Sequence, residues 1–345
     1  MISEKMISRL ENFARSILPD RVVRKLGALT KFRFPSGRPN VPLISIVVTK
    51  NVLAALWNFQ SCWRSSRAIK LYRGSLRELA SQSTNQNVKL LHLIYGLKQH
   101  EPFCYFHWAL VEKMISTIRP DRVLFHYTYE PQGVYWEKIK KKVCTVQVPP
   151  FEYYGVARIK HFAHKADVVR LLVLYEMGGL YLDIDTLVFK SFDDLFSASQ
   201  LVLGVERWHG RAEPRGLCNA VILAPRNHGG IRAWLQSYKY FRAKGIKLER
   251  YWAEHSVRLP LYWLPRRGDV KVLDSHSFFE INGDETNLFF NPDQAALVET
   301  RVAGAYSQHL WETFCMANLL ADFKVAAPAN ESFLAVQLRG VSSEP

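Results

Sequence analysis

Two carboxylates separated by a single residue, Asp183 and Asp185, are the most informative chemical feature of this sequence. In an extended strand both would point to the same face and lie about 6–7 Å apart. Two acids this close repel each other unless a positive charge lies between them. Mg²⁺ and Mn²⁺ prefer oxygen ligands and often complete their shells with phosphate oxygens. The pair is therefore either a metal site or a strand end that is solvated or paired with Arg or Lys.

A second charged pair, Asp167 and Arg170, lies at a spacing of i and i+3 in the preceding helix. Two interpretations are open. The residues form a local ion pair, with Asp167 favoured by the nearby N-terminus of the helix. Alternatively, they project into a polar cleft, where they bind hydroxyl groups and Arg170 grips a phosphate with two hydrogen bonds.

The elements around the two acids predict how they are positioned. A helix over His164–Met177 is apolar nearly all round, which indicates a buried helix. Gly178 suits the left-handed position at its C-terminal end, and Gly179 allows a tight reversal. A strand over Leu180–Phe189 follows, and its period of two places Tyr181 on the same face as the two carboxylates.

Strands and helices alternate through the rest of the chain. The sequence predicts strands at 88–95, 122–128, 143–148, 201–205 and 217–224, and helices at 103–118, 135–141 and 231–244. This alternation predicts an α/β fold with a mixed, mainly parallel sheet covered by helices on both faces. The polar run at 81–87 sets the expected division into a basic helical extension (1–80), a main domain (81–330) and a C-terminal tail (331–345).

Positive charge is concentrated in the first 80 residues. They contain 15 Lys and Arg but four acids, which accounts for +11 of the net charge of +15. Apolar residues recur at helical spacing over residues 2–18, and Pro19 ends the segment. This helix either packs on its own domain or lies on an anionic membrane surface. A nucleic-acid partner is not expected, because the basic residues are scattered among apolar runs and no nucleic-acid module is visible.

The five cysteines are widely spaced and form no zinc-binding pattern, which favours free thiols in a reducing compartment. No signal peptide is apparent. The apolar run over Val41–Trp57 is short, and Lys50 near its centre would cost about 2.5–3.5 kcal/mol in a bilayer. We therefore expect a cytoplasmic protein, with peripheral contact at the inner membrane face if the N-terminal helix binds lipid.

The central block resembles the DXD-containing sugar-binding region of family 32 glycosyltransferases. The shared pattern is a small residue, Asp, two apolar residues and Arg, then an apolar helix, Gly-Gly and an apolar-Tyr-apolar-Asp-x-Asp strand. The matching residues here are Ala166, Asp167, Arg170, Gly178, Gly179, Tyr181, Asp183 and Asp185. The block is also similar to the catalytic domains of the clostridial glucosylating toxins and to α1,4-galactosyltransferases. The resemblance extends over residues 88–318 and leaves the first 80 unexplained.

Three flanking segments extend this resemblance. Residues 89–96 are similar to the family's opening strand, and Tyr95 replaces a Trp that stacks on the donor base in the toxins. A Tyr can also stack on a base, but the change leaves the base preference open. Residues 217–222, which include Asn219, resemble the Asn-Ala-Val strand that forms the far side of the cleft in this family. His309 belongs to a Tyr-x-x-His-x-Trp segment, where it is a third metal ligand, a diphosphate contact or a structural residue.

The resemblance implies a GT-A fold, a nucleotide-diphosphate sugar as donor (UDP- or GDP-linked) and retention of anomeric configuration. It implies that Asp185 binds Mn²⁺ or Mg²⁺, and that Asp183 bridges the metal and the donor sugar or ribose. Asp167 and Arg170 would hold the sugar hydroxyls and the diphosphate, beside Tyr181. The acceptor would be a glycan or a lipid-linked sugar.

Two features near the cleft are weaker predictions. Glu206 follows the strand at 201–205 and is the carboxylate best placed to stabilise a cationic sugar. The loop over 207–216 is either a mobile lid that contacts the acceptor or an ordinary surface loop. The alternative to an enzyme is a non-catalytic protein that binds carbohydrate or nucleotide sugar on the same fold. The intact Asp-x-Asp pair argues against it.

Overall fold

The computed structural model describes residue 52 and residues 55–82, 88–197, 199–207, 210, 213–241 and 253–341. The predicted helix over residues 2–18 lies outside these ranges, and so do Trp208 and His209 of the predicted lid. Among the described helices, none combines the length and the apolar character that crossing a membrane requires.

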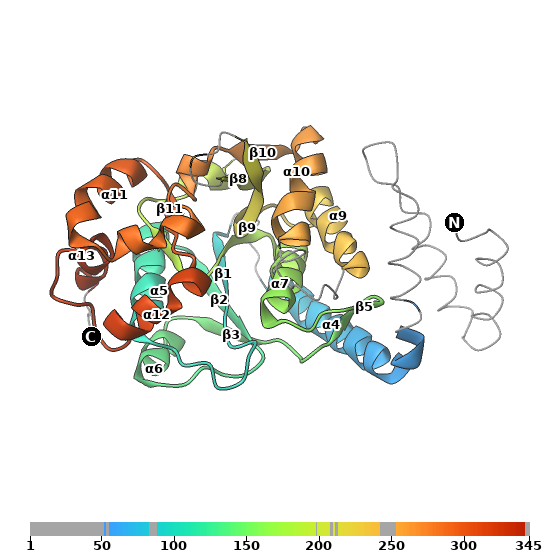
Figure 1. The fold of residues 1–345 in the computed structure, drawn as a ribbon. Coiled ribbons are helices and arrows are strands. Elements are labelled where there is room, and N and C mark those ends of the chain that lie inside the picture. Colours follow the sequence, from blue (N-terminus) through green and yellow to red (C-terminus); the bar gives the residue numbers. More distant parts are fainter. Residues whose placement is uncertain are drawn as a thin grey trace.

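A seven-stranded sheet forms the centre of the molecule (Figure 1). Its strand order is β10-β8-β9-β6-β1-β2-β3. The pairs β1–β2, β1–β6, β2–β3 and β8–β10 are parallel, whereas β9 runs antiparallel to both β6 and β8. The predicted mixed, mainly parallel sheet is therefore confirmed. The strands span Leu90–Ile94 (β1), Arg122–Tyr127 (β2), Cys144–Gln147 (β3), Gly179–Leu182 (β6), Leu201–Arg207 (β8), Pro214–Ala224 (β9) and Val270–Leu273 (β10).

Helices cover both faces of this sheet (Figure 1). Side chains alternate along β1, so that Leu91 and Leu93 join one apolar cluster while Leu90 and Ile94 join another. The first cluster contains α5 (Tyr105–Ile118), α6 (Val134–Lys140), α11 (Ala295–Val302), α12 (Glu312–Asp322) and α13 (Phe333–Arg339). The second contains α4 (Phe59–Ser81), α7 (Phe162–Met177), α9 (Gly229–Ser237) and the end of α10 (Leu259–Trp263).

Two small sheets and several single turns complete the described elements. The short strands β4 (Tyr153–Tyr154) and β5 (Ala157–Arg158) pair with each other, and β7 (Thr186–Val188) pairs with β11 (Ser307–His309). Short helical elements lie at Asp193–Phe196 (α8), Tyr238–Tyr240, Glu254–Arg258, Leu264–Arg266, Ser275–Ser277, Gly283–Phe289 and Pro292–Gln294.

The predicted continuous strand over Leu180–Phe189 is wrong. The strand β6 ends at Leu182, and a turn closed by the Thr186 N–H on the Asp183 carbonyl (3.1 Å) separates it from β7. The physical reason is a change of partner, because β6 pairs with β1 and β9 whereas β7 pairs with β11. The two acids therefore belong to a turn and not to one face of a strand.

The predicted helix over 231–244 is also too long. The helix α9 ends at Ser237, and a single 3₁₀ turn over Tyr238–Tyr240 follows it. Residues 242–244 lie outside the described ranges. The helix starts at Gly229 because His228 caps it, accepting the Gly230 N–H on Nδ1 at 3.1 Å.

Both segments that flank the predicted main domain contribute helices to its core. In α4, Tyr72 and Leu76 are buried in the second apolar cluster, and Arg77 donates to the buried Glu176 of α7 at 2.6 Å. In α13, Phe333 and its neighbours are buried in the first cluster. The limits of an independently folding domain remain a prediction.

The Gly178–Gly179 turn lets α7 lead directly into β6. Gly178 has φ 73° and ψ −168°, and Gly179 has φ 103°. The predicted left-handed position of Gly178 is wrong, because its φ is positive but its ψ lies outside the left-handed helical region, in a region that glycine alone occupies readily. A Cβ on Gly179 would lie 2.8 Å from both the carbonyl oxygen and the Cβ of Leu90. Glycine is thus required here by contact as well as by conformation.

A buried row of hydrogen bonds connects α4 to this turn. The carbonyl oxygen of Gly178 can only accept, so His92 Nε2–H donates to it at 2.9 Å. Burial lowers the pKa of His92 to about 4, so the ring is neutral and its Nδ1 accepts from His126 Nε2–H at 3.1 Å. The Tyr72 hydroxyl then donates to His126 Nδ1 at 2.8 Å. Each hydrogen has one possible position, so the row fixes both histidine tautomers.

We predict that Gly179→Ala destabilises the fold by at least about 2 kcal/mol, because it combines backbone strain with a clash against Leu90. Gly304→Ala is the matched control, because Gly304 also has a positive φ (83°) but nothing lies within 4 Å of an added Cβ. Urea unfolding measures both. Equal losses in the two variants would show that strain alone, and not the approach of β1, requires Gly179.

A second prediction concerns the stability of the fold at acid pH. The folded-state pKa of His92 lies below its unfolded value of about 6.5, so its contribution to stability is complete above that pH and is lost as the pH falls toward 4. Between about pH 7 and pH 5, the free energy of unfolding should fall by about 2 kcal/mol more in the wild type than in His92→Gln. Parallel pH profiles, measured by urea unfolding at each pH, would contradict this assignment.

Candidate active site

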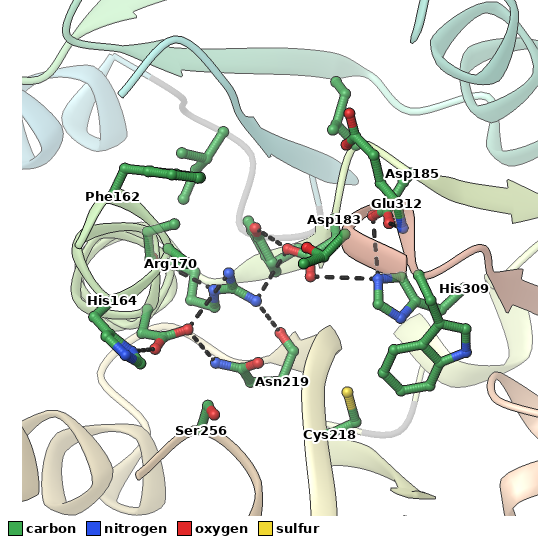
Figure 2. Close-up of a pocket in the computed structure, with 18 of the residues that line it drawn as sticks. Phe162, His164, Arg170, Asp183, Asp185, Cys218, Asn219, Ser256, His309 and Glu312 are labelled. Carbon is green, nitrogen blue, oxygen red and sulfur yellow. Dashed lines mark hydrogen bonds and ion pairs between the residues drawn. The ribbon is translucent and has the colours of Figure 1, made fainter. Parts of the chain in front are cut away.

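One pocket brings together all nine side chains that the sequence singled out. They are Tyr95, Asp167, Arg170, Tyr181, Asp183, Asp185, Glu206, Asn219 and His309. Figure 2 labels Arg170, Asp183, Asp185, Asn219 and His309 among them. The pocket lies where the parallel strands β1 and β6 end, because Tyr95 directly follows β1 and Asp183 directly follows β6. This edge is where α/β sheets bind their ligands.

An imidazole faces the two acids across the pocket. His309 Nε2 lies 3.1 Å from an Asp185 oxygen and 3.7 Å from an Asp183 oxygen. One ligand atom from each residue lies within 4.8 Å of the others. The pairing of β11 with β7 creates this arrangement, because it aligns His309 with Thr186, the residue after Asp185. The expected grouping of His309 with the Asp-x-Asp pair is thus what the structure has.

Asp185 is held more firmly than Asp183. Its side chain is 9% exposed, against 23% for Asp183, and its second oxygen accepts the Glu312 N–H at 2.7 Å. Burial by itself would raise the pKa of Asp185, but His309 and the Glu312 N–H hold it below its usual value. Burial opposes a charged His309 as well, yet the carboxylates raise its pKa above the ordinary histidine value. The carboxylates therefore favour a proton on the His309 ring and offset the cost of its burial.

Arg170 provides positive charge on the other side of Asp183. Its Nη1 lies 3.0 Å from an Asp183 oxygen and donates to the Asn219 carbonyl at 2.8 Å. Its guanidinium lies 4.6 Å from the centre of the Tyr181 ring, and the Tyr181 hydroxyl donates to Asp183. Burial disfavours the charged form, but Asp183 and the neighbouring groups raise the pKa of Arg170 well above its usual value. The residue is therefore a permanent buried cation beside the acids.

Asp167 is fixed by three partners. One oxygen accepts from Asn219 Nδ2 at 2.7 Å, and the other accepts from His164 Nδ1 at 3.1 Å. Arg170 Nη2 lies 3.5 Å away, so the ion pair suggested by the i, i+3 spacing exists but is looser than the pair with Asp183. Burial would raise the pKa of Asp167, and these partners hold it below its usual value. The ion pair therefore exists and both residues line the pocket, whereas their binding of hydroxyl groups or a phosphate stays a prediction.

Glu206 lies in the pocket wall but is 1% exposed. One of its oxygens forms an ion pair with Arg215 of β9, and the other has no hydrogen-bond partner among the described residues. The carboxylate is thus buried, partly neutralised by Arg215 and unsatisfied on one oxygen.

The Tyr95 ring is less available than the sequence comparison implied. It is 9% exposed, its hydroxyl donates to the Pro102 carbonyl at 2.7 Å, and it packs against Phe103 and His107. Phe162, at the start of α7, lines the same pocket and is 38% exposed. Of these two rings, Phe162 offers more surface to a planar group.

Several pocket residues were missed by the sequence analysis. Glu312 fixes Asp185, Arg215 pairs with Glu206, His164 binds Asp167, and Phe162 forms part of the wall. The spacing of His164, three residues before Asp167 on the same helix, could have revealed one of them. The others depend on how distant elements pack, which no local pattern shows.

Comparison with known proteins identifies the central block. Residues 97–202 match the family described as the glycosyltransferase sugar-binding region containing a DXD motif. The chain is also 35% identical over 244 residues to glucan organizing enzyme 1 of Cryptococcus neoformans var. grubii serotype A. This alignment covers 66% of the chain and 63% of that relative, so the chain spans less than two thirds of the relative's length.

Two solved structures are similar at low sequence identity. The galactosyltransferase LgtC, in complex with donor and acceptor sugar analogs, aligns with a TM-score of 0.40 and 12% identity over 73% of this chain and 94% of that chain. The PaToxG glycosyltransferase aligns with a TM-score of 0.34 and 15% identity over 83% of this chain and 98% of that chain. By sequence, residues 97–202 of this chain are thus similar to glycosyltransferase sugar-binding regions that contain the DXD motif.

Proposed function

We propose that this chain is a metal-dependent, retaining glycosyltransferase of GT-A type. It transfers a sugar from a nucleotide-diphosphate sugar, linked to UDP or GDP, to a glycan or lipid-linked acceptor. The observation that carries the proposal is the pocket itself, in which Asp183, Asp185 and His309 converge beside the Asp167–Arg170 pair. The name of the similar glucan organizing enzyme 1 supports a role in polysaccharide synthesis.

The chemistry of the donor groups fits a divalent cation. Two carboxylates and one imidazole nitrogen face one another within 4.8 Å, and this mixed set suits Mn²⁺ or Mg²⁺. Asp183, Asp185 and His309 would hold the ion, and His309 would have to be neutral to do so. When bound, such an ion acts as a Lewis acid that offsets the negative charge on a leaving diphosphate.

The sugar-binding side of the pocket is formed by α7 and β9. Asp167 is an ionised acceptor held by Asn219 and His164, so it can accept a hydrogen bond from a sugar hydroxyl without moving. Arg170 keeps Asp183 in place and adds fixed positive charge near the diphosphate. Neither residue has to reorganise when the donor binds, because their mutual contacts already fix them.

The nucleobase would stack on an aromatic wall. The family resemblance assigns this contact to Tyr95. The Phe162 ring is more exposed than the Tyr95 ring, however, and offers a base the larger surface for stacking. Each base–aromatic stack contributes about 1–3 kcal/mol and tolerates different bases. This tolerance leaves both UDP- and GDP-sugars within the proposal.

Glu206 is the candidate for stabilising a cationic sugar during transfer. One of its oxygens lacks a hydrogen-bond partner among the described residues, although Arg215 offsets part of its charge. A carboxylate in this state can interact electrostatically with a developing oxocarbenium ion. Retention then follows if the acceptor hydroxyl approaches from the face that the diphosphate leaves.

We predict that Asp185→Ala lowers Mn²⁺-dependent hydrolysis of the preferred nucleotide sugar by about 100-fold or more, because it removes a buried metal ligand. Released nucleotide is measured with and without Mn²⁺. The matched control is Asp293→Ala, which removes an exposed acid outside the pocket and should leave the rate unchanged. Turnover by a folded Asp185→Ala chain at the wild-type rate would remove the metal assignment.

We also propose that the basic N-terminal part binds an anionic membrane peripherally, which would bring the pocket to a lipid-linked acceptor. Besides the net charge of residues 1–80, the described helix α4 exposes Arg64, Arg67 and Lys70 together with Trp63 and Leu71. Basic and aromatic side chains side by side are typical of surfaces that bind lipid headgroups.

Deleting residues 1–40 should lower binding to anionic vesicles by at least about tenfold, since each Lys or Arg near such a surface contributes about 1 kcal/mol. Donor hydrolysis should persist, because the pocket lies in residues 94–314. Co-sedimentation with anionic vesicles measures binding, and neutral vesicles serve as the control. A full-length chain that stays in the supernatant at low salt would contradict the membrane proposal.

A further inference from the structure

The strand that carries His309 is short and weakly supported by strand pairing. The strand β11 has three residues, and its pairing partner is the equally short β7. On its other side the backbone meets a segment without strand structure, where the His309 N–H donates to the Phe278 carbonyl at 3.1 Å. Because only three residue pairs join β11 to β7, other contacts must fix the position of β11.

The ring of His309 also lacks the usual second anchor. Metal-binding histidines normally donate their other ring nitrogen to a carboxylate, a carbonyl or water, which fixes the ring orientation. Here Nδ1 of His309 is buried and has no hydrogen-bond partner among the described residues. The ring is instead packed edge-on against Trp311 (centroids 4.4 Å apart) and Phe279 (6.2 Å). Apart from the contact of its Nε2 with Asp185 at 3.1 Å, the orientation of the ring therefore depends on where the backbone of β11 lies.

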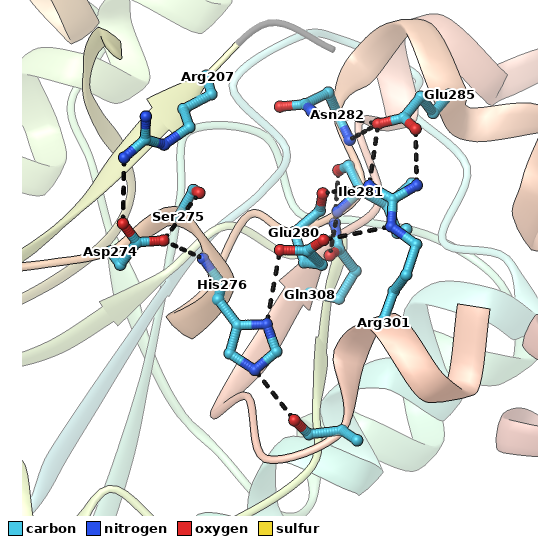
Figure 3. Close-up of polar contacts among 11 residues, drawn as sticks. Arg207, Asp274, Ser275, His276, Glu280, Ile281, Asn282, Glu285, Arg301 and Gln308 are labelled. Carbon is cyan, nitrogen blue, oxygen red and sulfur yellow. Dashed lines mark hydrogen bonds and ion pairs between the residues drawn. The ribbon is translucent and has the colours of Figure 1, made fainter. Parts of the chain in front are cut away.

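The preceding side chain, Gln308, ties this backbone to the neighbouring segment (Figure 3). Gln308 is fully buried, and its amide is fully used. Its Oε1 accepts the Ile281 N–H at 2.9 Å, while its Nε2 donates to the carbonyls of Ile281 (2.8 Å) and His309 (2.6 Å). Trp311 Nε1 donates to the same Ile281 carbonyl at 2.9 Å. The Ile281 carbonyl thus anchors residues on both sides of His309.

Arg301 of α11 holds the neighbouring peptide group, which joins Glu280 to Ile281 (Figure 3). Its Nη2 donates to the Glu280 carbonyl at 2.9 Å, and its Nε donates to the Glu280 carboxylate at 3.2 Å. Its Nη1 also reaches Glu285 at 2.7 Å, and Glu285 accepts the Asn282 N–H at 3.2 Å. The residues before and after Ile281 are therefore both tied to one guanidinium.

We propose that Gln308 is a positioning residue for His309, with Arg301 supporting it, and that this clamp sets how tightly the pocket binds a divalent cation. The inference rests on the proposed function, since it takes His309 as a metal ligand. By holding the backbone on both sides of His309, the clamp orients the ring in place of the hydrogen bond that its Nδ1 does not make. Gln308 lies behind His309 and takes no part in the pocket wall.

The test measures Mn²⁺ binding directly, by electron paramagnetic resonance, in the presence of excess UDP and, in parallel, of GDP. Gln308→Met keeps an unbranched side chain of similar length but removes all three hydrogen bonds. We expect the Mn²⁺ dissociation constant to rise about tenfold or more, as is typical when support of a metal ligand is lost. Metal-free nucleotide binding should not change, because α7 and β9 are untouched.

The matched control is Ser65→Ala. Ser65 is buried on α4, and its hydroxyl accepts the N–H groups of Glu152 and Tyr153 at 3.0 and 3.2 Å, so the variant also frees two backbone groups. Its Mn²⁺ affinity should equal that of the wild type. If Gln308→Met does not fold, Arg301→Met decides the question, because it leaves Gln308 in place and should weaken Mn²⁺ binding several-fold.

The outcomes separate the two proposals. A wild-type chain that binds no Mn²⁺ with either nucleotide removes the metal site, and this inference with it. Wild-type binding together with unchanged affinity in a folded Gln308→Met chain, or in Arg301→Met where that variant is decisive, overturns the positioning role and leaves the metal site standing. Weakening in Ser65→Ala equal to that in Gln308→Met overturns it as well, because the effect would then be general.

Discussion

Two neighbouring carboxylates, of which Asp185 is buried and Asp183 is partly buried, are stable at the end of a sheet only if positive charge lies beside them, and this pairing of charges organises the pocket. Arg170 lies 3.0 Å from Asp183 on one side, and His309 lies 3.1 Å from Asp185 on the other. Removing one partner of such a group would leave an uncompensated buried charge. A divalent cation would displace the proton from His309 and add one further positive charge beside the two acids, where a diphosphate could offset it.

The backbone that delivers these groups is constrained from both ends. At the start of β6, the Gly178–Gly179 turn lies in close contact with Leu90. The hydrogen bonds from Tyr72 through two neutral histidines hold the Gly178 carbonyl in place. At the β11 end, Gln308 and Arg301 hold the peptides around Ile281. Helices α4 and α11, far apart in sequence, thus act on the two sides of one site. The pocket therefore depends on contacts from several helices and strands of the fold and not on the Asp-x-Asp motif alone.

The sequence predicted the features that depend on local pattern. It failed where a strand changes its pairing partner or where distant segments come into contact. The helix over α7 and the sheet class followed from periodicity, whereas the grouping of the nine pocket residues also depended on the family resemblance. The continuous strand through the two acids was wrong, because β7 leaves the main sheet to pair with β11. Glu312 was missed for the same reason, since its N–H reaches Asp185 across 127 residues. Tyr95 was assigned by analogy, and its burial against Phe103 and His107 depended on neighbours that the analogy did not include.

The central claim is that this pocket cleaves the bond between a sugar and a nucleoside diphosphate with the help of a metal. The most direct measurement is the nucleotide released when the full chain is incubated with a panel of UDP- and GDP-sugars, with Mn²⁺ or with a chelator. The account predicts release from one or a few donors in Mn²⁺, and little or none in chelator. Binding of a nucleotide sugar without release from any donor, under every metal condition, would contradict it and would indicate a carbohydrate-binding protein on the same fold.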